Sequence, residues 1–90
     1  MKDTIKGQVT EIIDGDTFDM NVTQVGKNNK ERYNAEERVR ISGIDTPELP
    51  SESGRQAKDN LEKKIKGKAV RCNIETRDTY GRIVASIEVL

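Results

Sequence analysis

The chain has 90 residues, which is enough for one small domain, and its 32% hydrophobic and 36% charged residues allow only a small core. Its formal net charge is zero, which excludes a bulk electrostatic attraction to nucleic acid or membranes, so phosphate binding would need locally placed positive charge. It contains no histidine, which excludes a histidine general base and a histidine-ligated zinc site.

A first strand is predicted over residues 5–13, and the Asp14-Gly15 pair that follows it indicates a tight turn. A second strand follows, because apolar and polar residues alternate from residue 17 onward. Its expected core-facing residues are Phe18, Met20 and Val22. The polar residues 26–37 predict a long hairpin loop, after which the alternation resumes as a third strand over residues 38–44.

A single helix is expected after this third strand, which Pro47 and Pro50 end. Ser53 and Gln56 have the spacing of a capping box. The apolar stripe of the helix is Ala57, Leu61 and Ile65. Gly67 is suited to the helix end, and two more strands are predicted at residues 69–74 and 83–89, joined by a turn.

This order predicts a mainly β (α+β) fold: a five-stranded OB-type barrel with one helix between strands three and four, forming a single domain over residues 1–90. In an OB-type barrel the first–second and fourth–fifth loops lie at one end, and because the first three strands alternate in direction, the end of the third strand lies at that end too. Five polar residues are therefore expected to meet there. They are Asp16, Arg40, Asp45, Glu48 and Arg82.

These five side chains are chemically suited to cleaving a phosphodiester. The carboxylates of Asp16 and Asp45 suit a hard cation such as calcium. The guanidinium forks of Arg40 and Arg82 match phosphate oxygens and can neutralise charge that builds on phosphorus. Glu48 lies three residues past Asp45 and could orient or deprotonate a water molecule.

Each motif alone has an ordinary structural interpretation. The segment 14–17 is typical of a hairpin turn, residues 46–48 of a helix start, and residues 80–82 of a turn with an exposed arginine. Arg40 alone would be a solvated residue on a strand. The combination, rather than any single motif, points to a site.

The same motifs are those of a known family. They are residues 13–17 (IDGDT), residues 39–48 (VRISGIDTPE), the Gly54, Ala57 and Leu61 helix pattern, and residues 78–82 (DTYGR). In this order, they make the chain resemble the staphylococcal nuclease (thermonuclease-like) family over nearly its whole length.

The resemblance implies a calcium-dependent nuclease that acts on DNA and RNA, cleaves the 5′-O–P bond and leaves 3′-phosphates. It implies that Asp16, Asp45 and the carbonyl of Thr46 hold calcium. It also implies that Glu48 is the general base or positions the water. In the same way Arg40 and Arg82 would clamp the scissile phosphate, and Tyr80 would contact a terminal phosphate of the nucleotide.

The chain departs from the family at three places. Thr79 stands where the best-known member has a phosphate-contacting lysine, and the loop after Glu48 is short and lacks lysine and tyrosine. The sequence ends at Leu90, where the family usually continues into two C-terminal helices, so we expect a barrel without them. Such a barrel would leave an apolar flank uncovered, which a homodimer would bury.

Two other functions stay open at this point. A non-catalytic OB module that binds nucleic acid or a protein partner is the main alternative, and a calcium-binding structural module is another. The loop 26–37 carries Lys27, Lys30, Arg32 and Tyr33, but we expect it to be solvated rather than bound to nucleic acid.

The remaining expectations concern Cys72 and the compartment. Cys72 lies in an apolar alternation and is expected to be a small core residue. No apolar run is long enough to cross a membrane, so we expect no membrane partner. No signal-peptide apolar region is present, so we expect a soluble protein whose compartment the sequence leaves open: secreted if a signal has been removed, and otherwise cytoplasmic.

Overall fold

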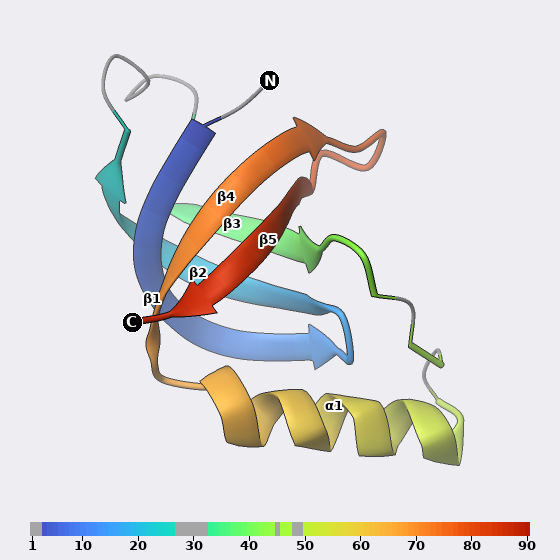
Figure 1. The fold of residues 1–90 in the computed structure, drawn as a ribbon. Helices are drawn as coiled ribbons and strands as arrows, with labels where there is room; N and C mark the ends of the chain where they lie inside the picture. Colours follow the sequence, from blue (N-terminus) through green and yellow to red (C-terminus); the bar gives the residue numbers. More distant parts are fainter. Residues whose placement is uncertain (1–2, 27–32, 45, 48–49) are drawn as a thin grey trace.

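The computed structural model describes residues 3–26, 33–44, 46–47 and 50–90. Five strands close into a barrel in the order β1-β2-β3-β5-β4, and a helix follows β3 in the sequence (Figure 1). The element bounds are β1 Asp3–Asp14, β2 Thr17–Val25, β3 Glu36–Ile41, α1 Glu52–Ile65, β4 Ala69–Arg77 and β5 Ile83–Val89. The predicted OB-type barrel with one helix between strands three and four is confirmed.

Strand β1 closes the barrel because it pairs antiparallel with β2 along one edge and with β4 along the other. Ile5 and Val9 point into the core in its first half. A register shift between Val9 and Glu11 then changes which face the side chains reach, so that Ile12 is buried and Glu11 is exposed. This bulge lets one long strand serve both neighbours.

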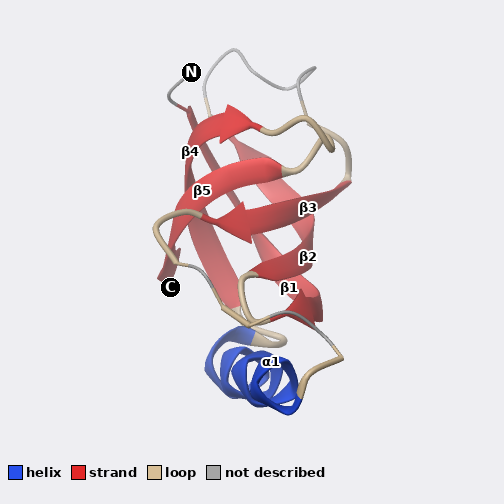
Figure 2. Ribbon diagram, turned by 90° about the vertical axis from the view of Figure 1, so that its right-hand side faces the viewer, coloured by secondary structure: helices blue, strands red, loops and turns tan. Residues whose placement is uncertain are grey.

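The core fills the interior of the barrel, and α1 lies across one end of it (Figure 2). Leu61 and Ile65 of the helix are buried there with the barrel residues. Cys72 is fully buried, as predicted, and its burial raises the pKa of the thiol to about 12. It therefore packs as a small apolar residue rather than a reactive thiol.

The helix begins two residues earlier than the capping-box pattern predicted. Ser51, not Ser53, is the N-cap, and its hydroxyl oxygen accepts the backbone N–H of Gly54 at 3.0 Å. Ser53 instead lies within the first turn. The predicted helix end is confirmed at Gly67, whose φ of +76° suits glycine and whose N–H donates to the Val9 carbonyl at 3.1 Å.

Strand β3 is shifted toward the N-terminus relative to the prediction of residues 38–44. It starts at Glu36, inside the segment predicted as loop, and it ends at Ile41, where Ser42 and Gly43 form a turn. Gly43 has a φ of +81°, which a strand does not allow. Tyr33 packs against the core, so the prediction of a solvated loop is wrong for that residue, while Lys27, Lys30 and Arg32 lie outside the described residues.

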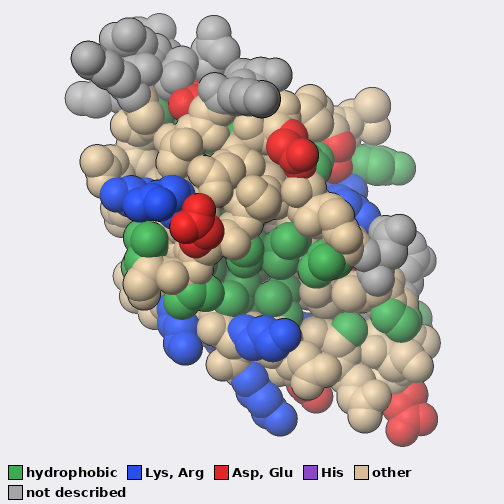
Figure 3. Space-filling view, in the orientation of Figure 1, with side chains coloured by type: hydrophobic (Ala, Val, Ile, Leu, Met, Phe, Trp, Pro, Cys, Tyr) green, Lys and Arg blue, Asp and Glu red, His purple; other side chains and the backbone are tan. Residues whose placement is uncertain are grey.

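Apolar side chains are exposed on the face of the molecule that Figure 3 presents. Ile44, Val89 and Leu90 are among the large apolar residues that stay exposed. The homodimer that would bury such a surface stays a prediction. Among the described residues, the only helix, α1, is too short and too polar to cross a bilayer.

Close packing at Gly15 joins the β1–β2 turn to the helix, and it generates a prediction. A β-carbon on Gly15 would lie 2.6 Å from Cβ of Ala57 and 2.7 Å from Oγ1 of Thr46. We therefore expect Gly15→Ala to lower the free energy of unfolding, measured in urea, by about 1–3 kcal/mol through overpacking.

The matched control is Ala57→Gly, which alone should cost about 1 kcal/mol because glycine weakens a helix. Combined with Gly15→Ala it should cost clearly less than the sum of the two, because the clash is relieved. Strictly additive losses would show that Gly15 does not pack against Ala57 as described.

Candidate functional site

The turn between β1 and β2 fixes the carboxylate of Asp16. Asp14 accepts the backbone N–H of Asp16 through Oδ1 at 3.0 Å, and the Thr17 hydroxyl donates to Oδ1 of Asp16 at 3.0 Å. Thr17 was predicted to lie on the polar face, but it is 1% exposed because it packs at the turn beneath Asp16. The Asp16 side chain is consequently held in one orientation at the rim of the barrel.

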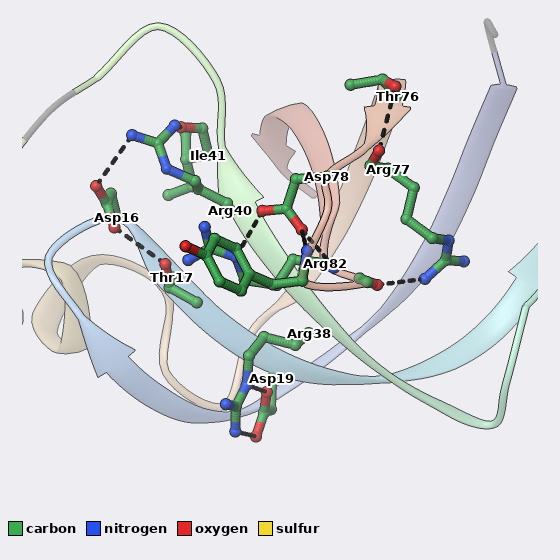
Figure 4. A network of polar contacts seen from close by, with 12 residues as sticks. Asp16, Thr17, Asp19, Arg38, Arg40, Ile41, Thr76, Arg77, Asp78 and Arg82 are labelled. Carbon is green, nitrogen blue, oxygen red and sulfur yellow. Dashed lines mark hydrogen bonds and ion pairs between the residues drawn. The ribbon is translucent and has the colours of Figure 1, made fainter.

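Arg40 faces this carboxylate from the neighbouring strand. Antiparallel pairing of β2 with β3 places Arg40 opposite Thr17. A terminal nitrogen of Arg40, Nη2, lies 3.6 Å from Oδ2 of Asp16 (Figure 4). The structure therefore brings together a carboxylate and a guanidinium that are 24 positions apart in the sequence.

The pKa of Asp16 lies above its ordinary value. Burial raises the pKa of Asp16, and the adjacent Asp14 raises it further, while the Thr17 hydroxyl and Arg40 lower it. Arg40 thus only partly compensates the negative charge of the turn. Carboxylate and carbonyl oxygens are the ligands that calcium prefers, so the donor set predicted at this rim fits that ion.

The β4–β5 turn is organised by Asp78. Its Oδ1 accepts the backbone N–H groups of Tyr80 at 3.0 Å and Arg82 at 2.8 Å, and its Oδ2 accepts Nε–H of Arg82 at 2.7 Å. Partial burial raises the pKa of Asp78, but these hydrogen bonds and the charge of Arg82 outweigh it and hold the pKa below its ordinary value of 3.8.

The side chain of Arg82 is partly exposed, and Tyr80 lies beside it. The carbon at the centre of its guanidinium lies 5.3 Å from the centroid of the Tyr80 ring, which is 84% exposed. Within the described part of the chain, the side-chain hydrogen bonds of Arg82 come from Nε alone, so both terminal nitrogens are available to a ligand. An exposed ring and an available fork suit a nucleotide and its phosphate.

Arg82 is the last residue before β5, at the end of the β4–β5 turn. The parallel pairing of β3 with β5 sets Ile83 opposite Val39 and Val84 opposite Arg40, so Arg82 precedes the partner of Arg40 by two residues. In Figure 1 the β1–β2 turn, the end of β3 and the β4–β5 turn lie on the same side of the barrel. Arg40 on β3 and Arg82 just before β5 are therefore diagonal neighbours.

Two predicted residues, Asp45 and Glu48, lie outside the described residues, so their predicted roles stay predictions. Thr46 is described and lies against Gly15, next to Asp16. Among the described residues no group of three or more acidic or cysteine side chains forms a metal cluster. Within that part of the chain, the site thus consists of Asp16, Arg40, Tyr80 and Arg82.

Asp78 and Glu37 are the residues whose importance the sequence interpretation missed. Asp78 was assigned only to a turn, although an aspartate that starts a turn commonly accepts backbone N–H groups two residues on. Glu37 was assigned to a solvated loop, but it is 6% exposed. Glu37 precedes Val39 by two residues and therefore lies on the same, core-facing side of β3. A carboxylate in such a position requires a compensating partner, and this pattern could have identified it.

The sequence of this chain is similar to those of known nucleases. A sequence profile described as "Staphylococcal nuclease homologue" matches residues 38–90. A "Staphylococcal-like nuclease" of Arabidopsis thaliana is 44% identical over 50 residues, which cover 56% of this chain and 16% of that protein. A "Probable endonuclease" of Coccidioides posadasii is 33% identical over 104 residues, covering 96% of this chain and 33% of that protein.

An "Uncharacterized endonuclease" of Escherichia coli is 30% identical over 83 residues, covering 92% of this chain and 48% of that protein. The chain thus spans less than half the length of each of these relatives. The resemblance inferred from the motifs is confirmed by these matches.

The Asp78–Arg82 pair predicts a pH dependence of stability. Because the pKa of Asp78 in the folded state lies below 3.8, its ionised form stabilises the fold above that pH, and this contribution is lost as the pH falls through the folded-state value. We expect Asp78→Asn to be less stable than the wild type at neutral pH, by up to about 1 kcal/mol.

The difference should shrink well below pH 3.8, where the wild-type carboxyl is also neutral. Urea denaturation at a series of pH values measures it. A difference that stays constant from neutral to strongly acidic pH would contradict the assignment.

Proposed function

This chain belongs to the staphylococcal nuclease family, and we propose that it is a calcium-dependent nuclease that hydrolyses phosphodiester bonds of DNA and RNA. The observation that supports the proposal is the pair of arginines formed by Arg40 on β3 and Arg82 directly before β5, with the Asp16 carboxylate 3.6 Å from Arg40. A carboxylate and two guanidinium groups at one surface suit a metal ion and a phosphate together, and a stacking platform alone would not need them.

In this proposal Arg40 and Arg82 bind the scissile phosphate. Arg40 lies beside the Asp16 carboxylate, and Asp78 holds Arg82 through its Nε–H. As water adds to phosphorus, negative charge grows on the phosphoryl oxygens, and the two guanidinium groups stabilise it. Tyr80 would lie against the nucleotide on the other side of Arg82.

Glu48 is the proposed general base, which rests on its place in the sequence motif. It would take a proton from the attacking water as the new O–P bond forms. The 5′-oxygen leaves with a proton from solvent, which yields a 3′-phosphate and a 5′-hydroxyl.

Asp16, Asp45 and the carbonyl of Thr46 are the proposed calcium ligands. A bound calcium ion would supply positive charge and Lewis acidity at the phosphate. The fit rests on the oxygen character of the donors and on the charge of the turn at Asp14 and Asp16, which Arg40 only partly compensates.

The main alternative is a non-catalytic module that binds nucleic acid or a protein partner. The zero net charge and the 3% aromatic content favour weak or lost cleavage activity, and they are the observations on the side of this alternative. Cleavage and binding are separable in one experiment.

The decisive variant is Arg82→Ala, assayed with single-stranded DNA and calcium. The wild type should cleave with calcium and stop when a chelator is added, and Arg82→Ala should be slower by about 100- to 1,000-fold because a group that stabilises the transition state is lost. The matched control is Arg71→Ala, which removes an arginine of β4 that pairs with Glu88 at 3.6 Å, away from the site.

The control should cleave at nearly the wild-type rate. A wild type that binds DNA and calcium without cleaving it would overturn the nuclease and leave the binding module. Equal losses in both variants would mean that Arg82 contributes only bulk charge.

A second variant, Asp16→Asn, tests the calcium ligands. We expect its dissociation constant for calcium, measured by titration calorimetry, to rise at least about tenfold because a charged oxygen ligand is lost. Asp19→Asn is the control, since Asp19 pairs with Arg38 on the outer face rather than with the site. Unchanged calcium affinity in Asp16→Asn would exclude Asp16 as a ligand.

A further inference from the structure

A buried carboxylate on β3 joins three segments outside the ligand-binding groups described above. The side chain of Glu37 is 4% exposed. Its Oε1 accepts Nη1–H of Arg77 at 3.0 Å, and its Oε2 accepts Nη2–H of Arg77 at 3.2 Å and the backbone N–H of Asn34 at 2.9 Å. The carboxylate is therefore satisfied by a bidentate guanidinium and one backbone donor.

The same guanidinium also holds the turn that carries Arg82. Nη1 of Arg77 donates to the carbonyl oxygen of Gly81 at 2.8 Å, next to Arg82 in the chain (Figure 4). The guanidinium carbon lies 5.9 Å from the centroid of the Tyr33 ring, and the Tyr33 hydroxyl donates to Asp3 at 2.7 Å. Arg77 is thus fixed from several directions while it contacts the turn.

The contacts of Asp78 and those of Arg77 do different things to the turn. Every hydrogen bond described for the Asp78 carboxylate ends within residues 78–82, so these bonds set the shape of the turn. The Arg77 contacts run from Gly81 to Glu37, on the strand that also carries Arg40. They therefore set the position of the turn relative to β3.

Stability alone is a weak reason for such a pair. A buried ion pair often contributes no more to folding than apolar residues of the same volume, because both charges lose their hydration. What an apolar pair cannot supply is a directed hydrogen bond to the Gly81 carbonyl. The planar fork of arginine can hold Glu37 and Gly81 at once, which a lysine ammonium does less well.

We propose that Arg77, anchored by Glu37, is a positioning residue that holds Arg82 in register with Arg40. The expected effect on cleavage rests on the proposed nuclease function. The expected effect on the order of the β4–β5 turn rests on the contacts alone. In this proposal Glu37 and Arg77 support the candidate site without contacting the phosphate or the metal ion.

The test is a double-mutant cycle of Arg77→Ala and Arg82→Ala, read in kcat on single-stranded DNA with saturating calcium. Arg77→Ala alone should lower kcat by about 10- to 100-fold, since displacing a catalytic group by roughly 1 Å has that effect. In the Arg82→Ala background the same change should alter kcat less than about twofold, because Arg77 acts through Arg82. The calcium dissociation constant should stay unchanged.

Equal fold losses in the two backgrounds would overturn the proposal, because a general structural defect would act regardless of Arg82. Arg71→Ala is the control for charge on the same strand. Arg77→Lys keeps the positive charge beside Glu37, and it replaces Arg77→Ala in the cycle if Arg77→Ala does not fold. It should lower kcat in the same background-dependent way.

A second measurement is independent of cleavage. Backbone ¹⁵N order parameters of Tyr80, Gly81 and Arg82 should fall in Arg77→Ala and in Glu37→Gln, while those of the β4–β5 pairs near Arg71 stay unchanged. If the wild type does not cleave, the proposed function fails, and the order parameters alone decide the positioning. A turn that stays ordered in both variants would overturn it even if the wild type cleaves.

Discussion

Strand β3 is paired on both edges, antiparallel to β2 and parallel to β5, and the candidate site depends on these two registers. The first register sets Arg40 opposite Thr17, and so beside Asp16. The second sets Arg40 opposite Val84, and so diagonal to Arg82. A slip of one residue in either register would turn Arg40 toward the core, because side chains alternate between the faces of a strand.

The two faces of β3 carry different kinds of side chain. Its outer face carries Arg40, which lies beside Asp16, and its inner face contributes Val39 and Ile41 to the core. Glu37 is the exception, because a carboxylate in a core-facing position requires a compensating partner. Arg77 is that partner. Because it also donates to the Gly81 carbonyl, it connects Glu37 on the inner face of β3 to the β4–β5 turn that carries Arg82.

Much of the fold was predictable because apolar alternation is a local signal. The strand order, the position of the helix and the burial of Cys72 were all predicted correctly from it. The N-cap at Ser51 was not predicted, because Ser53 is an equally suitable capping residue. The end of β3 at Ile41 was not predicted either, because apolar residues occur in the sequence as far as Ile44. The register that sets Val84 opposite Arg40 was not predicted either, because a parallel strand pair joins residues far apart in the sequence and leaves no local pattern.

The exposure of Tyr80 gives the site an optical property. The chain has no tryptophan and two tyrosines, so its tyrosine fluorescence comes from Tyr33 and Tyr80. The Tyr33 ring is partly buried and its hydroxyl is bonded to Asp3, whereas the Tyr80 ring is solvated beside Arg82. A nucleotide that stacks on Tyr80 would change the surroundings of one of only two fluorophores, so the protein carries a native reporter of ligand occupancy.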